Sequence, residues 1–187
     1  MIPISFPNSA ESSVPNPEIR TLASTILYTL SRKYNLRYNA SEGIQGDKYY
    51  GAHLRTGADA KAANWTSFEK QTQNYLQACK HNQLRVIYLV CTSEPDIHRF
   101  TSLAHTYAPH DIHVATAAHL LALHPKDLTT YAALSSPQRS LVDYEVLLKS
   151  TVFGGTVESS FSWNVGAAET RGVGEWDVGA ADGGFCL

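Results

Sequence analysis

The sequence predicts an α/β fold, with a Rossmann-like, mainly parallel sheet and helices on both faces. One observation is that segments with helical and strand patterns alternate over residues 17–171, which favours a parallel sheet. Another is residues 85–91, RVIYLVC, a nearly continuous apolar run. Continuous rather than alternating hydrophobicity is typical of a strand that is covered on both faces, as in a parallel sheet.

The first predicted helix covers residues 17–34. Asn16 can cap it, and Pro17 suits the first helical position. Its apolar residues recur at i, i+3, i+4 and i+7 spacing: Ile19, Leu22, Ala23, Ile26, Leu27 and Leu30. A second helix is predicted after Thr66-Ser67-Phe68-Glu69, which has the form of a capping box, and a third after Ser93, which can cap it. A fourth is predicted from Ser136, and a final one of about ten residues after Ser159.

Four strands are predicted between these helices, at residues 48–54, 85–91, 112–117 and 151–155. Residues 118–137 are ambiguous, since three leucines suggest a short helix while prolines bracket the rest. The carboxyl ends of parallel strands meet at one edge of a sheet, where ligands bind in open α/β folds. Three strand ends should therefore converge there: His53 to Arg55, Thr92 to Glu94, and Thr156 to Phe161.

The composition fits one globular domain, with 187 residues of which 43% are hydrophobic and 17% charged. Residues 1–16 are rich in Pro, Ser and Asn and are interpreted as a linker, while residues 172–187 are glycine-rich and interpreted as a disordered tail. The domain is expected between them, at 17–171. A net charge of −2 gives no overall footprint of a nucleic-acid binder.

Several cofactor classes are not indicated. The GxGxxG fingerprint of nicotinamide and flavin sites is absent. The three cysteines have no CxxC spacing, which indicates neither a zinc site nor a disulfide framework. The histidines between residues 105 and 124 lack a ligand spacing such as HExxH, so no metal site is expected among them.

Residues that could bind an anionic ligand follow two of the predicted strands, the first and the fourth. His53 and Arg55 are two residues apart, so they should leave the first strand on the same side. After the fourth strand, Gly154-Gly155-Thr156 suggests a tight turn, and Ser159 and Ser160 follow at a helix start, where free N–H groups and hydroxyls can bind phosphate. Two alternatives remain open: an ordinary solvated strand end at His53, and a Ser159 that only caps its helix.

Two segments together carry a resemblance to a known family. Residues 50–59, YGAHLRTGAD, are followed about ninety residues later by 143–156, DYEVLLKSTVFGGT, and by 159–162, SSFS. In this order and spacing they resemble the GDP-fucose protein O-fucosyltransferase family. The resemblance covers roughly residues 17–171 and implies the carboxy-terminal, donor-binding half of a GT-B glycosyltransferase.

The resemblance assigns roles to individual residues. Arg55 matches the arginine that lies at the diphosphate and helps GDP to leave, and is the expected catalytic residue; His53 matches its partner. The Thr156 segment and Ser159, Ser160 and Phe161 match the part that touches the phosphates and the nucleotide-sugar. Asp143 matches an acidic residue that opens the preceding helix.

The implied reaction is a metal-independent transfer of fucose from GDP-fucose to a protein or glycan hydroxyl, with no cofactor. The chain has no Asp-x-Asp motif, so Arg55 and the helix start would stabilise the leaving group. The family's aspartate near the end of the second strand is replaced by Cys91-Thr92-Ser93-Glu94. General-base candidates, by location only, are Glu94, Asp96 and Glu158.

The resemblance also implies partners and a location. An amino-terminal acceptor-binding half is missing from the chain, so the isolated chain is expected to be inactive if that half is essential. The full-length protein is expected in the ER or Golgi lumen, although the chain shows no targeting signal. The alternative is a degenerate domain that binds a nucleotide, or another protein, without transfer.

Overall fold

The computed structural model describes residues 16–39, 43–44, 49–108, 112–169 and 184–186. It confirms the predicted α/β fold. A five-stranded sheet has the order β5-β4-β3-β6-β7, in which β5, β4, β3 and β6 are parallel and β7 is antiparallel to β6. The strands are β3 (Tyr50–His53), β4 (Val86–Val90), β5 (His113–Ala115), β6 (Val152–Thr156) and β7 (Gly184–Cys186). A separate antiparallel pair is formed by β1 (Tyr38–Asn39) and β2 (Gly43–Ile44).

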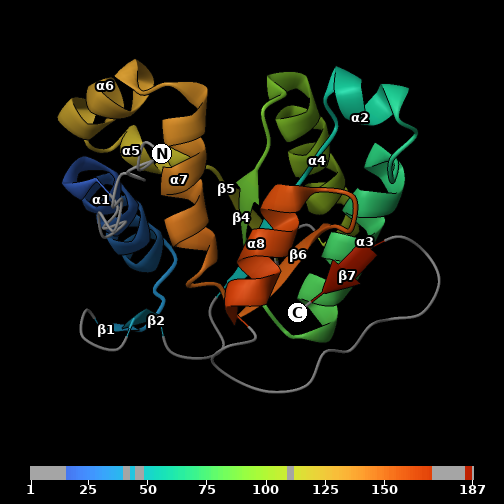
Figure 1. Cartoon of the computed structure of the whole chain (residues 1–187). Coiled ribbons are helices and arrows are strands. Elements are labelled where there is room, and N and C mark those ends of the chain that lie inside the picture. The colour runs from blue at the N-terminus through green and yellow to red at the C-terminus, as the bar shows by residue number, and fades with distance from the viewer. Residues whose placement is uncertain (1–15, 40–42, 45–48, 109–111, 170–183, 187) are drawn as a thin grey trace, which may run out of the picture.

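Helices lie on both sides of the sheet (Figure 1). On one side are α1, α5, α6 and α7, and on the other are α2, α3 and α4, while α8 lies against β6. Their bounds are α1 (Pro17–Lys33), α2 (Ala58–Ala62), α3 (Phe68–His81), α4 (Glu94–Tyr107), α5 (Ala117–Leu121), α6 (Pro125–Ala133), α7 (Ser136–Leu147) and α8 (Ser160–Glu169). Within the described ranges, none of these helices has the length and apolar character that crossing a membrane requires.

The β4 strand shows why the chain folds into these layers. Val86 and Tyr88 belong to the core cluster under α1, α5 and α7. Ile87 and Leu89 belong to the cluster under α3 and α4. Because successive side chains of a strand point to opposite faces, a continuous apolar run fills both cores. The prediction of a strand buried on both faces is confirmed.

Polar caps fix where the helices begin. The Asn16 side chain accepts a hydrogen bond of 3.0 Å from the Glu18 N–H, as predicted for α1. The Ser93 hydroxyl accepts one from the Asp96 N–H at the start of α4. For α3 the cap is Ser67 rather than Thr66, so this helix starts one residue later than the capping-box pattern indicates.

The structure differs from the sequence-based expectations at three places. The expected tight turn at Gly154-Gly155-Thr156 is wrong: all three residues belong to β6, which runs one residue past the predicted strand 151–155, and the turn follows at residues 157–158. Residues 184–186, expected in a disordered tail, form β7 on β6, where backbone hydrogen bonds outweigh the lack of a sequence pattern. The ambiguous segment 118–137 contains α5 and α6. Residues 1–15 of the expected linker (1–16), and residues 172–183 and 187 of the expected tail (172–187), lie outside the described residues.

The strand order creates one favourable ligand position. From β3 the chain adds β4 and then β5 on one side, and afterwards returns to add β6 on the other side of β3. Between β3 and β6 the winding direction therefore reverses. In open α/β sheets, a crevice forms outside the carboxyl ends of the strands at such a switch point, and ligands bind there.

Candidate functional site

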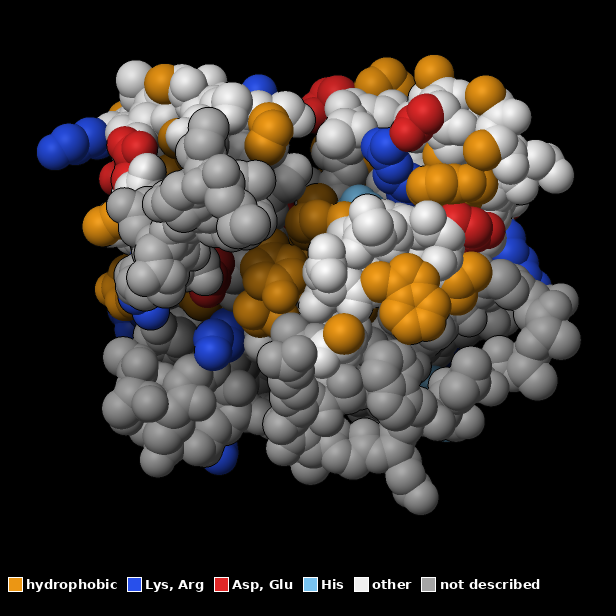
Figure 2. Space-filling view, in the orientation of Figure 1, with side chains coloured by type: hydrophobic (Ala, Val, Ile, Leu, Met, Phe, Trp, Pro, Cys, Tyr) orange, Lys and Arg blue, Asp and Glu red, His pale blue; other side chains and the backbone are white. Residues whose placement is uncertain are grey.

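A large pocket lies at this edge of the sheet. Its volume is about 1080 Å³, and it is lined by residues that follow β3, β4 and β5, by the start of α8 and by one side of α7. Figure 2 shows the surface hollowed between the α6–α7 side and the α2–α4 side of the molecule. The pocket contains five of the six residues predicted for the site: His53, Arg55, Ser159, Ser160 and Phe161. The predicted convergence of strand ends is confirmed.

Thr156 lies apart from the other predicted residues. It is the last residue of β6, is only 1% exposed and does not line the pocket. Within the part of the chain that the structure describes, its hydroxyl has no hydrogen-bond partner. The backbone at Thr156 still matters, because its carbonyl accepts a 3.1 Å hydrogen bond from the Ser159 N–H and shapes the turn into α8.

His53 is held as a neutral ring. Its Nδ1 lies 2.8 Å from the hydroxyl of Ser162, and its ring packs against Phe161 with 4.7 Å between the ring centroids. Burial, and secondarily the charge of Arg55, lower the pKa of His53 from 6.5 to about 4. The imidazole is therefore uncharged at physiological pH, and it can exchange hydrogen bonds with a ligand without contributing charge.

Arg55 is the arginine that follows β3 in the pocket, and Arg139 of α7 also lines it. The Arg55 guanidinium is paired with the carboxylate of Asp59, in the first turn of α2, and the Arg55 side chain remains 29% exposed where it lines the pocket. A surface ion pair of this kind is worth about 0–1 kcal/mol, so a ligand anion can replace Asp59 at little cost. In Figure 2, basic and acidic atoms lie side by side on the rim over α2.

The turn from β6 into α8 supplies the facing wall. Ser159 is buried and Ser160, the first residue of α8, is exposed, and both line the pocket. The first N–H groups of a helix have no partner within the helix and carry a partial positive charge. α8 comes close to β6 because Gly155 has no side chain: a Cβ there would lie 2.5 Å from the Ser162 hydroxyl.

Asp143 lies in the pocket wall on α7, and the sequence did not single it out as a site residue. It is inside the helix rather than at its start, which corrects the expectation from the resemblance. The Tyr88 hydroxyl donates a 2.6 Å hydrogen bond to it. Burial raises the pKa of Asp143 to about 7, against the smaller lowering effects of Tyr88 and Arg139. A tyrosine in an otherwise aliphatic strand, with a hydroxyl that needs a partner, was the available signal.

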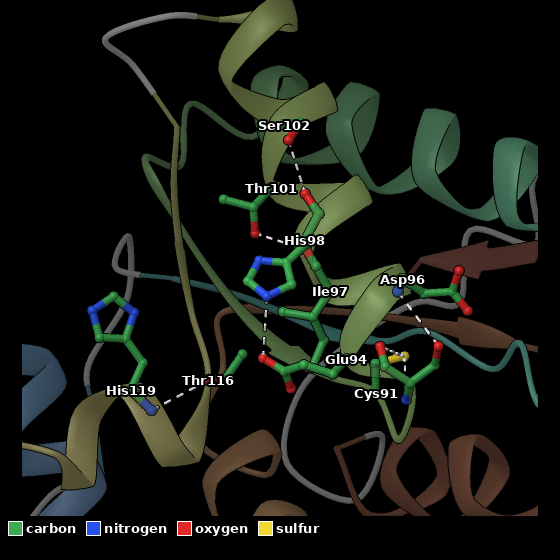
Figure 3. A network of polar contacts seen from close by, with 10 residues as sticks. Cys91, Glu94, Asp96, Ile97, His98, Thr101, Ser102, Thr116 and His119 are labelled. Carbon is green, nitrogen blue, oxygen red and sulfur yellow. Dashed lines mark hydrogen bonds and ion pairs between the residues drawn. The ribbon is translucent and has the colours of Figure 1, made fainter.

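The α4 side of the pocket is polar (Figure 3). Glu94 lines it and lies 3.6 Å from His98 of the same helix, with His119 of α5 on the other side of the space. Of the carboxylates considered as a general base, Asp96 accepts a 2.5 Å hydrogen bond from the Thr56 hydroxyl and does not line the pocket. Glu94 and Glu158 do line it. Among the described residues, no group of three or more His, Cys, Asp or Glu side chains is arranged to hold a metal.

Gln71 is a second residue that the sequence did not indicate. It belongs to α3, is 1% exposed, and its side-chain amide hydrogen-bonds the backbone of Arg55. A glutamine on the buried face of a helix resembles any other polar residue in the sequence, so only its contacts reveal what it holds.

No protein-family model matches the chain, and no curated protein matches it. At the carboxyl ends of β3 and β6, the pocket is lined by Arg55, the neutral ring of His53 and the start of α8.

Proposed function

We propose that the chain is the donor-binding domain of a fucosyltransferase-type enzyme, which binds GDP-fucose and transfers fucose to a hydroxyl of a protein or glycan. The observation that supports it most is the meeting, in one pocket at the switch point of the sheet, of Arg55 and His53 with the Ser159-Ser160-Phe161 turn. These are the residues that the family resemblance places at the diphosphate. The pocket volume of about 1080 Å³ is slightly above the roughly 300–1,000 Å³ of small-molecule sites, as suits a nucleotide with a sugar.

In this proposal, the diphosphate lies between Arg55 and the start of α8. The guanidinium exchanges Asp59 for phosphate oxygens, to which it can bind in a bidentate manner. The free N–H groups of α8 and the Ser160 hydroxyl add hydrogen bonds from the other side. When the bond from fucose to the diphosphate breaks, negative charge grows on the leaving GDP, and these fixed donors stabilise it.

The acceptor and its activation are outside this domain in the proposal. An acceptor-binding half would lie over the pocket and present the protein or glycan hydroxyl, in the ER or Golgi lumen. A base that takes the hydroxyl proton could come from that half or from Glu94, whose carboxylate lines the pocket with little burial.

A second candidate function is nucleotide binding without transfer. The Arg55–Asp59 ion pair favours it. If the guanidinium remains paired with Asp59 when a nucleotide binds, it holds the nucleotide weakly and does not stabilise the charge of the transition state.

Calorimetric titration with GDP tests the binding proposal. We expect binding by the wild type, and a loss of about tenfold to a hundredfold in affinity for Arg55→Ala, the range for a hydrogen bond to a charged group. Arg32→Ala is the matched control, because Arg32 is an exposed arginine in the last turn of α1 that does not line the pocket.

A folded wild-type chain that takes up no GDP would refute the proposal. If GDP binds, incubation with GDP-fucose separates the two candidates. Release of GDP, through transfer or slow hydrolysis, supports the transferase, and its absence in the presence of an added acceptor half supports binding alone.

A further inference from the structure

The backbone of Arg55 lies beyond the end of the β3 ladder. The last backbone bond to the neighbouring strand is donated by the Leu54 N–H to the Val90 carbonyl, at 2.8 Å. One residue later, the side-chain amide of Gln71 takes the place of a strand. The Arg55 N–H donates to Gln71 Oε1 at 3.0 Å, and Gln71 Nε2 donates to the Arg55 carbonyl at 2.9 Å.

Two residues of α3, one turn apart, hold this segment. The Tyr75 hydroxyl donates a 2.9 Å hydrogen bond to the carbonyl of His53. Gln71 and Tyr75 are each only 1% exposed. Both ends of the His53–Arg55 segment are therefore fixed to a packed helix, and the conformation of Arg55 does not depend on the solvent-exposed pair with Asp59.

The same amide reaches toward the opposite wall of the pocket. Gln71 Nε2 also donates to the Thr66 carbonyl, at 2.6 Å. The N–H and the hydroxyl of Thr66 donate to Glu158 Oε1, at 3.2 and 3.1 Å, and Glu158 is the residue before Ser159. A chain of hydrogen bonds thus runs from the backbone of Arg55 to the start of α8.

From these contacts we infer that Gln71 is a positioning residue for the anion-binding groups, which sets where Arg55 lies relative to Ser159. The inference rests on the proposed binding of GDP. An amide is required, because this position must accept from one backbone N–H and donate to two carbonyls. Replacement by an apolar side chain leaves buried backbone groups without partners and releases Arg55 from its fixed place.

The test compares Gln71→Met with Gln73→Met, an exposed glutamine on the same helix. Calorimetric titration with GDP should show an affinity at least about tenfold lower for Gln71→Met, since Arg55 is no longer held where it can bind the diphosphate, and an unchanged affinity for Gln73→Met. Circular dichroism and thermal unfolding confirm that both variants are folded. If Gln71→Met does not fold, Gln71→Glu replaces it.

Gln71→Glu adds a signature that a general structural defect would not give. An ionised carboxylate at this position can accept from the Arg55 N–H but repels the two carbonyls. A protonated carboxyl can accept and donate. As the pH is lowered from 8 to 5.5, the GDP affinity of Gln71→Glu should rise toward that of the wild type at the same pH. The affinity of Gln73→Glu, relative to the wild type, should not change with pH.

The outcomes separate this inference from the function on which it rests. A wild-type chain without GDP affinity refutes both. Two results would refute the positioning role and leave the proposed function intact, provided that the wild type binds GDP. One is an unchanged affinity in folded Gln71→Met. The other is a ratio of Gln71→Glu affinity to wild-type affinity that does not vary with pH.

Discussion

The pKa values of two residues that line the same pocket are shifted in opposite directions. The pKa of His53 falls to about 4, through burial and then through Arg55, so the ring stays neutral. The pKa of Asp143 rises to about 7 through burial, so the carboxyl stays protonated in mildly acid solution. Near pH 5–6 both side chains are uncharged, and Arg55 provides the charge that a ligand meets on the β3 side.

These shifts predict opposite pH dependences of stability. Between about pH 4 and 6.5, unfolded His53 binds a proton that the folded ring does not, so its contribution to the free energy of unfolding rises with pH. Folded Asp143 keeps a proton that the unfolded chain loses above about pH 4, so its contribution falls as the pH approaches 7. The two effects nearly cancel in the wild type.

Single substitutions should expose each effect. In His53→Gln, the free energy of unfolding should fall between pH 4.5 and 6.5 relative to the wild type; in Asp143→Asn, it should rise. The difference is at most about 3 kcal/mol, at 1.36 kcal/mol per pKa unit. Urea unfolding at several pH values measures it. Curves that run parallel to the wild type in both variants would mean that neither group titrates as its surroundings indicate.

At the scale of the elements, the glycines of β6 allow other elements to come close. A Cβ at Gly154 would lie 1.9 Å from the Tyr50 hydroxyl and 2.9 Å from the ring of Tyr75. The two tyrosine rings pack against each other with centroids 6.0 Å apart. Tyr75 is also the residue that holds the His53 carbonyl, so this packing supports the site.

We expect Gly154→Ala to lower the free energy of unfolding by about 2 kcal/mol, as is usual when a packed core receives an extra carbon. Gly57→Ala is the control: its Cβ would lie 2.6 Å from the end of the Asp59 side chain and 3.2 Å from that of Arg55, and both ends can move, so the loss should be smaller. Urea unfolding of both variants checks this. Equal stabilities would show that the tyrosines shift without cost.

At the scale of the whole molecule, the pocket joins elements from both sides of the sheet. α4 packs on the cluster that contains Ile87, whereas α7 packs on the cluster that contains Val86, and both helices line the pocket. A ligand would therefore contact structure on both faces. It should stabilise the domain as one unit, because it binds the folded chain and not the unfolded chain.

GDP should raise the thermal midpoint. At a concentration of one hundred times its Kd, mass action adds about 2.7 kcal/mol. At about 2–4 °C per kcal/mol for a domain of this size, the expected shift is about 5–10 °C. Differential scanning fluorimetry with and without GDP measures it. At the same GDP concentration, the tenfold to hundredfold weaker affinity expected for Arg55→Ala reduces the added free energy to about 0.4–1.4 kcal/mol, so its shift should be about half that of the wild type or less. A shift equal to that of the wild type would exclude Arg55 from the site.

The sequence alone determined the features that depend on local patterns. The period of apolar residues located α1, α3, α4 and α7, and the continuous run located β4, because burial imposes a spacing on each element. The alternation of elements then required that His53, Arg55 and the Ser159 turn share one sheet edge.

The tertiary structure alone decided which residues at that edge share the pocket. Hydrogen bonds between residues 16 to 92 positions apart fix Gln71 on Arg55 and Thr66 on Glu158. The side chains that approach Gly154 and Gly155 come from other elements, and burial in β6 separates Thr156 from the site. Such contacts leave no period in the sequence, because their partners are brought together only when the sheet is assembled.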